Sequence, residues 1–343
     1  MWAKKRPGRH PVRRALGAVV GAGVLLVAGV AFWLWGVLWY PRAGQTITLE
    51  IARGVSTSSI LEQFNTKGLL PSVNAGRLYL EVAARKRSLR WGRYVFEPGT
   101  RPVDVLEMAL DGQVQTLSVT IVEGISIDEV KRALLASGLA PSVAWDEFVN
   151  NTKPIVGLAP RAKSLEGFLF PDTYTFADGV DIVTVADHMV ARFHGVWEEE
   201  RLPTGAPARN AFDAVILASL IEAETALGEE RARIAGVFTN RLARGMLLQC
   251  DPTVVYALKR RGEWSGRLLR AHWKTDDPYN TYRYPGLPPG PINNPGRAAL
   301  AAALSPEKHH FLYFVADAHG GHTFSRTLKE HNRAVAQLRR SRH

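Results

Sequence analysis

Two carboxylates interrupt an otherwise apolar stretch, Ala211–Leu227, which reads AFDAVILASLIEAETAL. The stretch predicts a buried helix, and Glu222 and Glu224 lie near its end. Carboxylates are almost never fully buried without a partner, and an apolar setting disfavours their charged form and raises the pKa. A carboxyl group that keeps its proton near neutral pH can act as a general acid. This stretch is therefore the first candidate for catalytic chemistry.

A helical projection separates the two carboxylates. Glu222 shares a face with mostly small side chains, which would leave room for a ligand. Glu224 points to nearly the opposite side, where bulkier leucines suggest a packing face. The projection favours Glu222 as the acid. The alternative for either glutamate is a salt bridge on the helix surface, because Arg231 and Arg233 are close in sequence.

The chain begins with a basic segment, residues 1–14, followed by residues 15–40, which carry no charge. About 20 apolar residues suffice to span a bilayer as a helix, and a basic flank marks the cytoplasmic side. A cleaved signal peptide is the alternative, but its apolar region should be shorter and a small-residue cleavage site should follow. We therefore predict a cytoplasmic tail at 1–14 and a single-pass transmembrane helix at 15–40. Everything after Pro41 would lie on the periplasmic or extracytoplasmic side of the cytoplasmic (inner) membrane.

Composition narrows the classes of function. The formal net charge is +11, but the basic excess is concentrated before position 15, and no acidic residue precedes Glu50. No nucleic-acid-binding motif accompanies the charge, so we expect no nucleic-acid partner. Cys250 is the one cysteine, which excludes an intramolecular disulfide and a cysteine-based zinc site. The C-terminal histidines lack the spacing of metal ligands, so we expect neither a metal nor another cofactor.

An internal repeat follows the apolar segment. Residues 48–72 and 118–142 share Ile, Gly, Ser, Gly, Leu, Pro and Ser at matched positions. Each copy has an alternating strand pattern, a Gly-containing turn, a Ser or Thr N-cap and an amphipathic helix that ends at a glycine. A second strand and helix follow in each, with helices near 103–110 and 182–193. We expect a module at 45–115 that resembles LysM-like glycan-binding modules, and a related α/β module at 116–200. A structural spacer is the alternative to glycan binding.

The second copy contains an inserted aromatic stretch, SLEGFLFPDTY, at 164–174, with an acid at Glu166. Its aromatic side chains suit either the apolar face of a sugar or a core. A Pro/Gly-containing linker at 201–209 precedes the last domain, which we place at 207–343.

Polar side chains in the last domain suggest a binding cleft. Gln249 and Asp251 interrupt an apolar run, although Asp251 could simply be an N-cap, because Pro252 follows it. A long loop over 276–295 is rich in Pro, Gly, Asn and Tyr, and loops of this length in compact domains are usually functional or disordered. Its prolines and tyrosines argue against disorder, and Asn280 and Tyr282 are the preferred contacts to sugar hydroxyl and N-acetyl groups.

Several motifs in order resemble a known family. They are LEGFLFPDTY (165–174), ASLIEAET (218–225), VFTNRLARGMLLQCDPTVVY (237–256), DPYNTYRYPGLPPGPINNPG (277–296) and FVADAHGGHTFSRTLKEHN (314–332). Together with the apolar N-terminal segment, they resemble the YceG/MltG-like endolytic murein transglycosylases. The resemblance implies cleavage within nascent peptidoglycan strands, and it puts the catalytic glutamate on the first Glu of ASLIEAET, Glu222. Cys250 stands where we expect Ser, a departure that leaves this chemistry untouched.

The implied reaction needs a single carboxyl group. A bond between MurNAc and GlcNAc breaks through an oxocarbenium-like transition state. In a lytic transglycosylase the MurNAc 6-hydroxyl attacks its own C1 and leaves a 1,6-anhydro end, so one residue serves as acid and then as base. We assign both roles to Glu222. Two alternatives stay open: a muramidase in which Glu166 or Asp251 acts on water, and a non-catalytic glycan-binding scaffold for wall synthesis.

The expected architecture is thus α+β, with a transmembrane helix, a LysM-like module, a related second module and a mixed α+β catalytic domain. The residues expected to position the strand are Glu166, Ser219, Asn240, Gln249, Asp251, Asn280 and Tyr282. The expected partners are peptidoglycan strands, peptidoglycan synthases at the membrane, and the lipid bilayer through residues 15–40.

Overall fold

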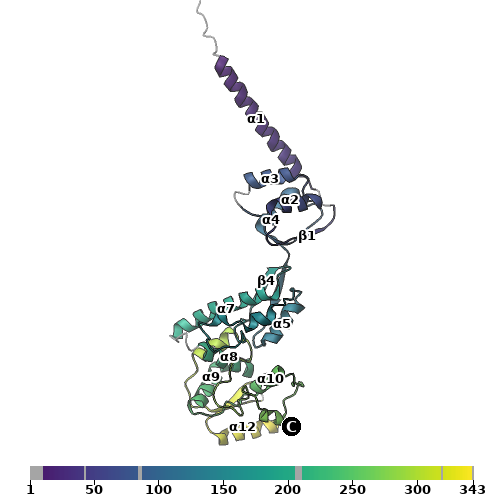
Figure 1. The fold of residues 1–343 in the computed structure, drawn as a ribbon. Coiled ribbons are helices and arrows are strands. Elements are labelled where there is room, and N and C mark those ends of the chain that lie inside the picture. Colours follow the sequence, from purple (N-terminus) through teal and green to yellow (C-terminus); the bar gives the residue numbers. More distant parts are fainter. Residues whose placement is uncertain (1–10, 42–43, 84–86, 205–210, 318–319, 342–343) are drawn as a thin grey trace, which may run out of the picture. The chain divides into compact units, whose positions relative to one another are not determined.

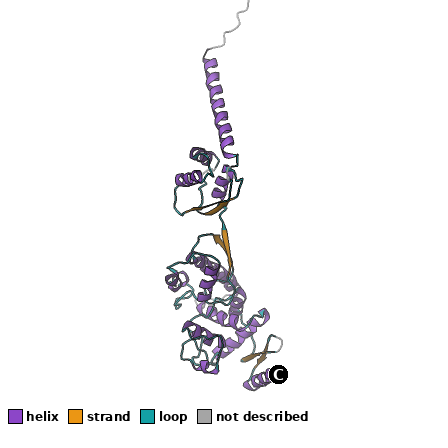
Figure 2. Ribbon diagram, turned by 90° about the vertical axis from the view of Figure 1, so that its right-hand side faces the viewer, coloured by secondary structure: helices purple, strands orange, loops and turns teal. Residues whose placement is uncertain are grey.

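The structure, a computed structural model, describes residues 11–41, 44–83, 87–204, 211–317 and 320–341. The chain divides into two compact units, one of residues 1–116 with 177–179, the other of residues 117–176 with 180–343. Helices dominate both units and the strands are short (Figure 2). This confirms a mixed α+β fold. The second repeat copy and the C-terminal region belong to the same unit.

The first unit begins with a long helix, α1 (Pro11–Leu38). Its part Ala18–Leu38 is long and apolar enough to cross a membrane, by length and composition. That is consistent with a single-pass anchor. The unit continues with β1 (Ile47–Ile51), α2 (Thr57–Thr66), α3 (Val73–Val82), β2 (Gly92–Phe96) and α4 (Pro102–Asp111) (Figure 1).

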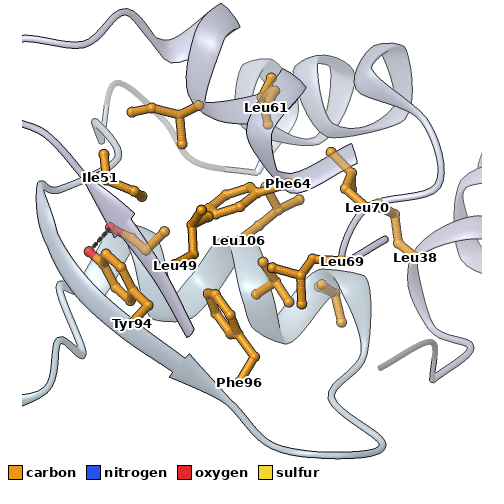
Figure 3. Packing of buried hydrophobic residues seen from close by; sticks show 14 of the residues in the cluster. Leu38, Leu49, Ile51, Leu61, Phe64, Leu69, Leu70, Tyr94, Phe96 and Leu106 are labelled. Atoms are coloured by element: carbon orange, nitrogen blue, oxygen red, sulfur yellow. Dashed lines mark hydrogen bonds between the residues drawn. The ribbon is translucent and has the colours of Figure 1, made fainter. Parts of the chain in front are cut away.

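The core of the first unit forms between a two-stranded sheet and its helices. β1 pairs antiparallel with β2, and Leu49 lies opposite Tyr94. Phe64 of α2 packs edge-on against Phe96 of β2, with ring centroids 6.1 Å apart (Figure 3). Leu38, from the last turn of α1, is fully buried in the same cluster. The end of the apolar helix is therefore part of this core.

The repeat predicted from the sequence is confirmed as local structure. The second copy contains β3 (Thr116–Thr120), α5 (Ile127–Ala136), β4 (Thr173–Ala177) and α7 (Ile182–Thr204), and α6 (Trp145–Asn150) and a 3-10 turn (Lys153–Ile155) lie between them. Gly54 and Gly124 both have positive φ, 84° and 79°, which a tight turn requires and glycine tolerates. Ser56 and Ser126 occupy the N-cap positions. The likeness of the first module to LysM stays a prediction.

α7 is longer than the sequence pattern indicated. Its buried residues recur one turn apart through Met189, Phe193 and Trp197, so the apolar face continues past the predicted end at 193. The helix extends to Thr204, and the prediction of a linker is wrong for 201–204. The rest of the predicted linker, 205–209, lies outside the described residues.

The C-terminal region is built around α8 (Ala211–Glu224), which is buried over most of its length. The elements that follow are α9 (Gly228–Ala243), α10 (Asp251–Arg260), a 3-10 turn (Arg270–Lys274), α11 (Arg297–Leu304), β5 (Tyr313–Ala316), β6 (His322–Ser325) and α12 (Leu328–Ser341). α9, α10 and α11 pack against α8. β5 and β6 form an antiparallel hairpin that packs against α12.

The inserted aromatic stretch belongs to the core. Phe168 and Phe170 are buried, so these rings are not a surface for sugars. Phe168 packs edge-on against Phe193 of α7, with centroids 4.8 Å apart. Gly167 has φ 87°, and a Cβ there would lie 2.6 Å from Pro291 and 2.8 Å from Val215. The stretch therefore packs the second module against α8 through the close approach of Gly167 to Val215.

Candidate active site

A cavity of about 370 Å³ opens at the end of α8, and Glu224, the last residue of that helix, lines it. Glu224 is partly buried. The other lining residues come from α9 (Arg241), the segment before α10 (Leu248, Gln249), the first residue of α10 (Asp251), the long loop (Tyr282), the β5–β6 hairpin (Tyr313, Phe314, Val315, Ala316, His322) and α12 (Leu328, His331). Of the residues predicted to bind substrate, Gln249, Asp251 and Tyr282 lie here.

Asp251 is fixed in the wall by two donors. Its Oδ1 accepts a hydrogen bond from the Tyr282 hydroxyl at 2.7 Å and one from Trp273 Nε1 at 2.9 Å. The rings of Trp273 and Tyr282 stack, with centroids 5.3 Å apart. Cys250, not Asp251, occupies the N-cap position of α10. The alternative that Asp251 simply caps the helix is therefore wrong.

The backbone before α10 is held in an unusual conformation. Gln249 has φ 52°, and it is the one non-glycine residue with positive φ among the residues the structure describes. The Gln249 N–H donates to the Thr281 carbonyl at 3.1 Å, and the Cys250 N–H donates to Thr281 Oγ1 at 3.0 Å. Non-glycine residues in this region cost conformational energy and cluster at functional sites. The long loop thus fixes the segment that presents Gln249 and Asp251 to the cavity.

The electrostatics of the cavity favour a protonated Glu224. Burial raises the pKa of Glu224, a hydrogen bond from the Cys250 thiol opposes that rise, and the nearby Asp251 carboxylate adds to it. Burial also raises the pKa of the Cys250 thiol well above its ordinary value, as expected for an inert, enclosed cysteine. A carboxyl group that is both protonated and reachable from a cavity can deliver a proton to a ligand there.

Glu222 is in a different environment. Its Oε1 accepts from Arg231 at 2.9 Å, and its Oε2 accepts from the backbone N–H of Gly296 at 3.0 Å. The side chain is 6% exposed, and it lines neither the Glu224 cavity nor the neighbouring cavity that contains Ala223. Burial raises its pKa, while the Gly296 N–H and Arg231 oppose the rise. The carboxylate ties α8 to α9 and to the start of α11.

The small side chains beside Glu222 have a different cause from the one predicted. Ser219 Oγ accepts from the N–H of Ile292 at 3.1 Å, and its carbonyl accepts from Asn293 Nδ2 at 2.9 Å. Backbone of the long loop occupies the space that the small side chains leave. At Ser219 the Glu222 face therefore packs against the long loop, and which of the two glutamates is the acid stays a prediction.

Asn280, Asn240, Ser219 and Glu166, which were predicted to bind substrate, instead make hydrogen bonds within the protein. Asn280 donates to the carbonyls of Trp273 and Thr275, and Asn240 donates to those of His309 and Phe311. Ser219 binds the long loop as described above. None of these residues, nor Glu166, lines the Glu224 cavity.

Glu166 joins three segments of the second unit. Its carboxylate accepts from the N–H of Ile127 at 3.0 Å, from the Tyr256 hydroxyl at 3.1 Å and from Asn294 Nδ2 at 3.3 Å. Burial raises its pKa to about 8, and the bonds from Ile127 and Tyr256 limit the rise. Glu166 lines a separate cavity of about 250 Å³.

Sequence reasoning missed several lining residues. Arg241 donates to the carbonyls of Leu248 and Leu312, and its guanidinium carbon lies 5.1 Å from the ring centroid of Tyr313. The imidazole of His331 stacks on the same Tyr313 ring, with ring centroids 5.3 Å apart. Burial and Arg241 lower the pKa of His331, so its imidazole is neutral near pH 7. The sequence drew attention to this histidine in the motif at 314–332 and among the C-terminal histidines weighed as metal ligands, without assigning it a role in the site.

Comparisons with known proteins agree on one family. The model of the YceG-like family matches residues 49–337. The endolytic murein transglycosylase of Bacillus subtilis (strain 168) is 30% identical over 314 residues, which are 84% of this chain and 84% of that protein. The protein of the same name from Streptococcus pneumoniae serotype 2 is 27% identical, and the match covers 85% of this chain and 58% of that longer protein. The crystal structure of a putative YceG-like protein from Listeria monocytogenes superposes with a TM-score of 0.53 at 30% identity, over 85% of this chain and 99% of that one.

Proposed function

The chain belongs to the YceG-like family, and from this premise we propose that it is a membrane-anchored endolytic murein transglycosylase with Glu224 as its catalytic acid. The observation that carries the assignment is the position of Glu224 on the wall of the 370 Å³ cavity, beside Asp251, Gln249 and Tyr282. The proposal moves the role that the sequence suggested for Glu222 to the second glutamate of the same motif. Both oxygens of Glu222 accept hydrogen bonds within the protein, which supports the choice of Glu224 over Glu222.

The reaction follows from one carboxyl group and the substrate's own hydroxyl. The protonated Glu224 gives its proton to the glycosidic oxygen as the bond from that oxygen to C1 of MurNAc breaks. The resulting carboxylate takes the proton of the MurNAc 6-hydroxyl as O6 bonds to C1. The products are a strand with a free GlcNAc 4-hydroxyl and a 1,6-anhydro-MurNAc end. No water is consumed, and Glu224 returns to its protonated form.

The environment of Asp251 supports this reaction over hydrolysis. A muramidase needs a second carboxylate, as a nucleophile or as the base for a water molecule. Oδ1 of Asp251 is engaged by Tyr282 and Trp273, which fixes the side chain in the wall. Glu166, the other carboxylate considered for that role, does not line this cavity. We assign Asp251, Gln249 and Tyr282 to positioning the strand beside Glu224.

The proposed location is the outer side of the cytoplasmic membrane. α1 contains an apolar span of the required length, and the basic residues before it favour a cytoplasmic N-terminus. The region 207–343 then supplies Glu224 outside the cytoplasm, and the modules at 45–115 and 116–200 precede it. Nascent strands and the synthases that make them are the partners this location would bring within reach.

The chemistry of the product ends tests the proposal. Purified strands are digested with the full chain in detergent, and the new ends are identified by mass spectrometry. A lytic transglycosylase gives 1,6-anhydro-MurNAc ends, whereas a muramidase gives reducing ends that are heavier by one water. Strands that are bound but never shortened, even at high protein concentration, would contradict the enzyme and favour a glycan-binding scaffold.

A further inference from the structure

A glutamate and a histidine form a largely buried pair at the wall of the Glu224 cavity. Glu230 lies in the first turn of α9, and His322 is the first residue of β6. Nδ1 of His322 lies 2.6 Å from Oε2 of Glu230, and the backbone N–H of His322 donates to Oε1 at 2.8 Å. The side chains of His322 and Glu230 are 13% and 12% exposed. A short bond between two largely enclosed groups fixes the position of the imidazole.

The neighbouring residues are fitted to this pair. Gly321 precedes the histidine, and a Cβ there would lie 3.0 Å from Oε1 of Glu230, so the glycine leaves room for the carboxylate. Phe314 of β5 packs edge-on against the imidazole, with ring centroids 5.4 Å apart. A hydrogen bond and a ring contact therefore hold the imidazole in one orientation.

His322 turns one ring nitrogen to Glu230 and leaves the other free. His322 lines the Glu224 cavity and Glu230 does not, so the edge of the ring at Nδ1 faces away from the cavity. Nε2 makes no hydrogen bond within the part of the chain that the structure describes, and it is not enclosed by protein. It differs in this from Nδ1 of His331, the other histidine of the cavity, which is buried and has no partner among the described residues. A ligand in the cavity can therefore reach Nε2 of His322.

The bond to Glu230 suits the imidazole to act as a base. An ionised carboxylate only accepts hydrogen bonds, so Nδ1 carries the proton and Nε2 presents a lone pair when the ring is neutral. If Nε2 takes up a proton, the carboxylate stabilises the positive charge of the ring. The same carboxylate–imidazole arrangement removes the proton of a hydroxyl group in serine hydrolases. In the proposed reaction, the hydroxyl that must lose its proton is the 6-hydroxyl of MurNAc.

We propose that His322 is a second proton-transfer residue, and that the 6-hydroxyl proton reaches Glu224 through its Nε2. The inference rests on the proposed function and adds one step to it. Nε2 takes the proton as the O6–H bond breaks and O6 bonds to C1. The imidazolium then passes this proton to the carboxylate that Glu224 became when it protonated the leaving oxygen. Both residues return to their starting forms, and the products are unchanged.

The surroundings of the two residues support this exchange. Both line the same cavity, and burial raises the pKa of Glu224 whereas positive charge on His322 lowers it. Arg241, also in the wall, is a fixed cation that cannot take up a proton, and its guanidinium is bound to the carbonyls of Leu248 and Leu312. His322, by contrast, combines an unbound basic nitrogen with a carboxylate that stabilises its charged form.

Two variants and a matched control separate a base from a structural residue, with each rate counted per folded molecule. His322→Gln cannot take up a proton, so kcat should fall about 10²-fold while KM changes less than about threefold. In Glu230→Gln the amide oxygen stays with the His322 N–H and the amide NH₂ faces Nδ1. This moves the imidazole proton to Nε2 and removes its lone pair, so we expect a similar fall in kcat. His310→Gln, at an exposed histidine of the same unit, is the matched control and should match wild type.

Chemical rescue tests the base directly. His322→Ala, confirmed as folded by a thermal melt, is assayed with added imidazole and with pyrrole, a ring of the same size without a basic nitrogen. We expect imidazole to raise kcat of this variant at least about tenfold in a saturable way, and pyrrole to leave it unchanged. Imidazole should raise kcat neither of wild type nor of Glu224→Gln, which lacks the acid.

Several results overturn the inference and leave the proposed function standing. A kcat within about threefold of wild type for both His322→Gln and Glu230→Gln would remove the pair from the reaction. A rise in KM with an unchanged kcat would make His322 a binding residue only. Equal effects of imidazole and pyrrole on folded His322→Ala would show that the pair is structural. Absence of anhydro ends with wild type, by contrast, overturns the proposed function itself.

Discussion

Two glutamates on different sides of the last turn of α8, Glu222 and Glu224, have different surroundings. Glu222 is closed in by Arg231 and the N–H of Gly296, whereas Glu224 lines a cavity shared with Asp251 and Tyr282. Burial raises the pKa of both carboxyls. A raised pKa therefore does not identify the acid on this helix. What distinguishes the two in the structure is that Glu224 lines this cavity and Glu222 does not.

The largest expected effect is on catalysis by Glu224→Gln. The amide keeps the shape of the side chain but cannot deliver a proton, so turnover should fall by about 10²- to 10⁴-fold. The thermal unfolding temperature should not fall, because the protonated carboxyl group and the amide are both neutral and of nearly the same size. Release of new strand ends at pH 7 and a thermal melt provide the two readouts. Turnover within tenfold of wild type would remove Glu224 from the mechanism.

Glu222→Gln should instead affect stability. It leaves Arg231, whose side chain is 12% exposed, without its nearer carboxylate partner at 2.9 Å and with Glu123 at 3.7 Å, and we expect a loss of about 2–3 kcal/mol in the free energy of unfolding. Chemical denaturation measures the loss, and activity per folded molecule should stay within about tenfold of wild type.

The double variant Glu222→Gln/Arg231→Leu is the matched control for this stability effect. It removes the charge that the single variant leaves buried, so it should recover part of the lost stability. A single variant as stable as wild type would show that the ion pair contributes nothing to the fold.

Glu166 extends the comparison to a buried carboxyl outside the Glu224 cavity. Its pKa rises from 4.5 to about 8 in the folded protein, so the folded state holds a proton that the unfolded state releases between those values. The stabilisation from this proton is complete below about pH 4.5 and is lost as pH rises towards 8, by up to about 1.4 kcal/mol per pH unit. Glu166→Gln should remove that slope from stability measured between pH 5 and 8. An unchanged slope would assign it to other groups.

The smallest expected effect comes from Cys250, whose thiol donates to Glu224. Serine is the stronger donor and favours the carboxylate, so Cys250→Ser should move the alkaline limb of the pH–rate profile to lower pH. Cys250→Ala removes the donor and should move the same limb to higher pH. The pH dependence of kcat/KM measures both shifts. Identical profiles for the three proteins would separate Cys250 from the acid.

Local patterns in the sequence predicted the repeated modules well because each signal acts within a few residues. The turn glycines, the serine N-caps and the helix-ending glycines all appear where expected. Their tertiary roles differ between copies, however. A Cβ at Gly54 would meet nothing within 4 Å, whereas one at Gly124 would lie 3.4 Å from Glu222 Cγ. One turn is open and the other packs against α8, and the repeat pattern is the same for both.

The site was harder to predict because the same residue types serve binding and folding. Asn280 and Asn240 have amides that suit sugars, yet the structure uses them to satisfy loop carbonyls. The small face beside Glu222 accommodates backbone, as the bond from Ile292 to Ser219 shows. Gln249, Asp251 and Tyr282 do line the Glu224 cavity, and the sequence pointed to them because polar groups in an apolar run and in a long ordered loop are hard to explain otherwise. Which glutamate faces the cavity depends on distant segments, above all the β5–β6 hairpin and α12.

The most direct test of the central claim compares the two glutamates in one assay. Wild type, Glu222→Gln and Glu224→Gln, each confirmed as folded by a thermal melt, digest the same purified nascent strands, and 1,6-anhydro-MurNAc ends are counted by mass spectrometry. We predict such ends from wild type and Glu222→Gln, and none above background from Glu224→Gln. Anhydro ends from Glu224→Gln, together with a folded but inactive Glu222→Gln, would contradict the assignment and return the catalytic role to Glu222.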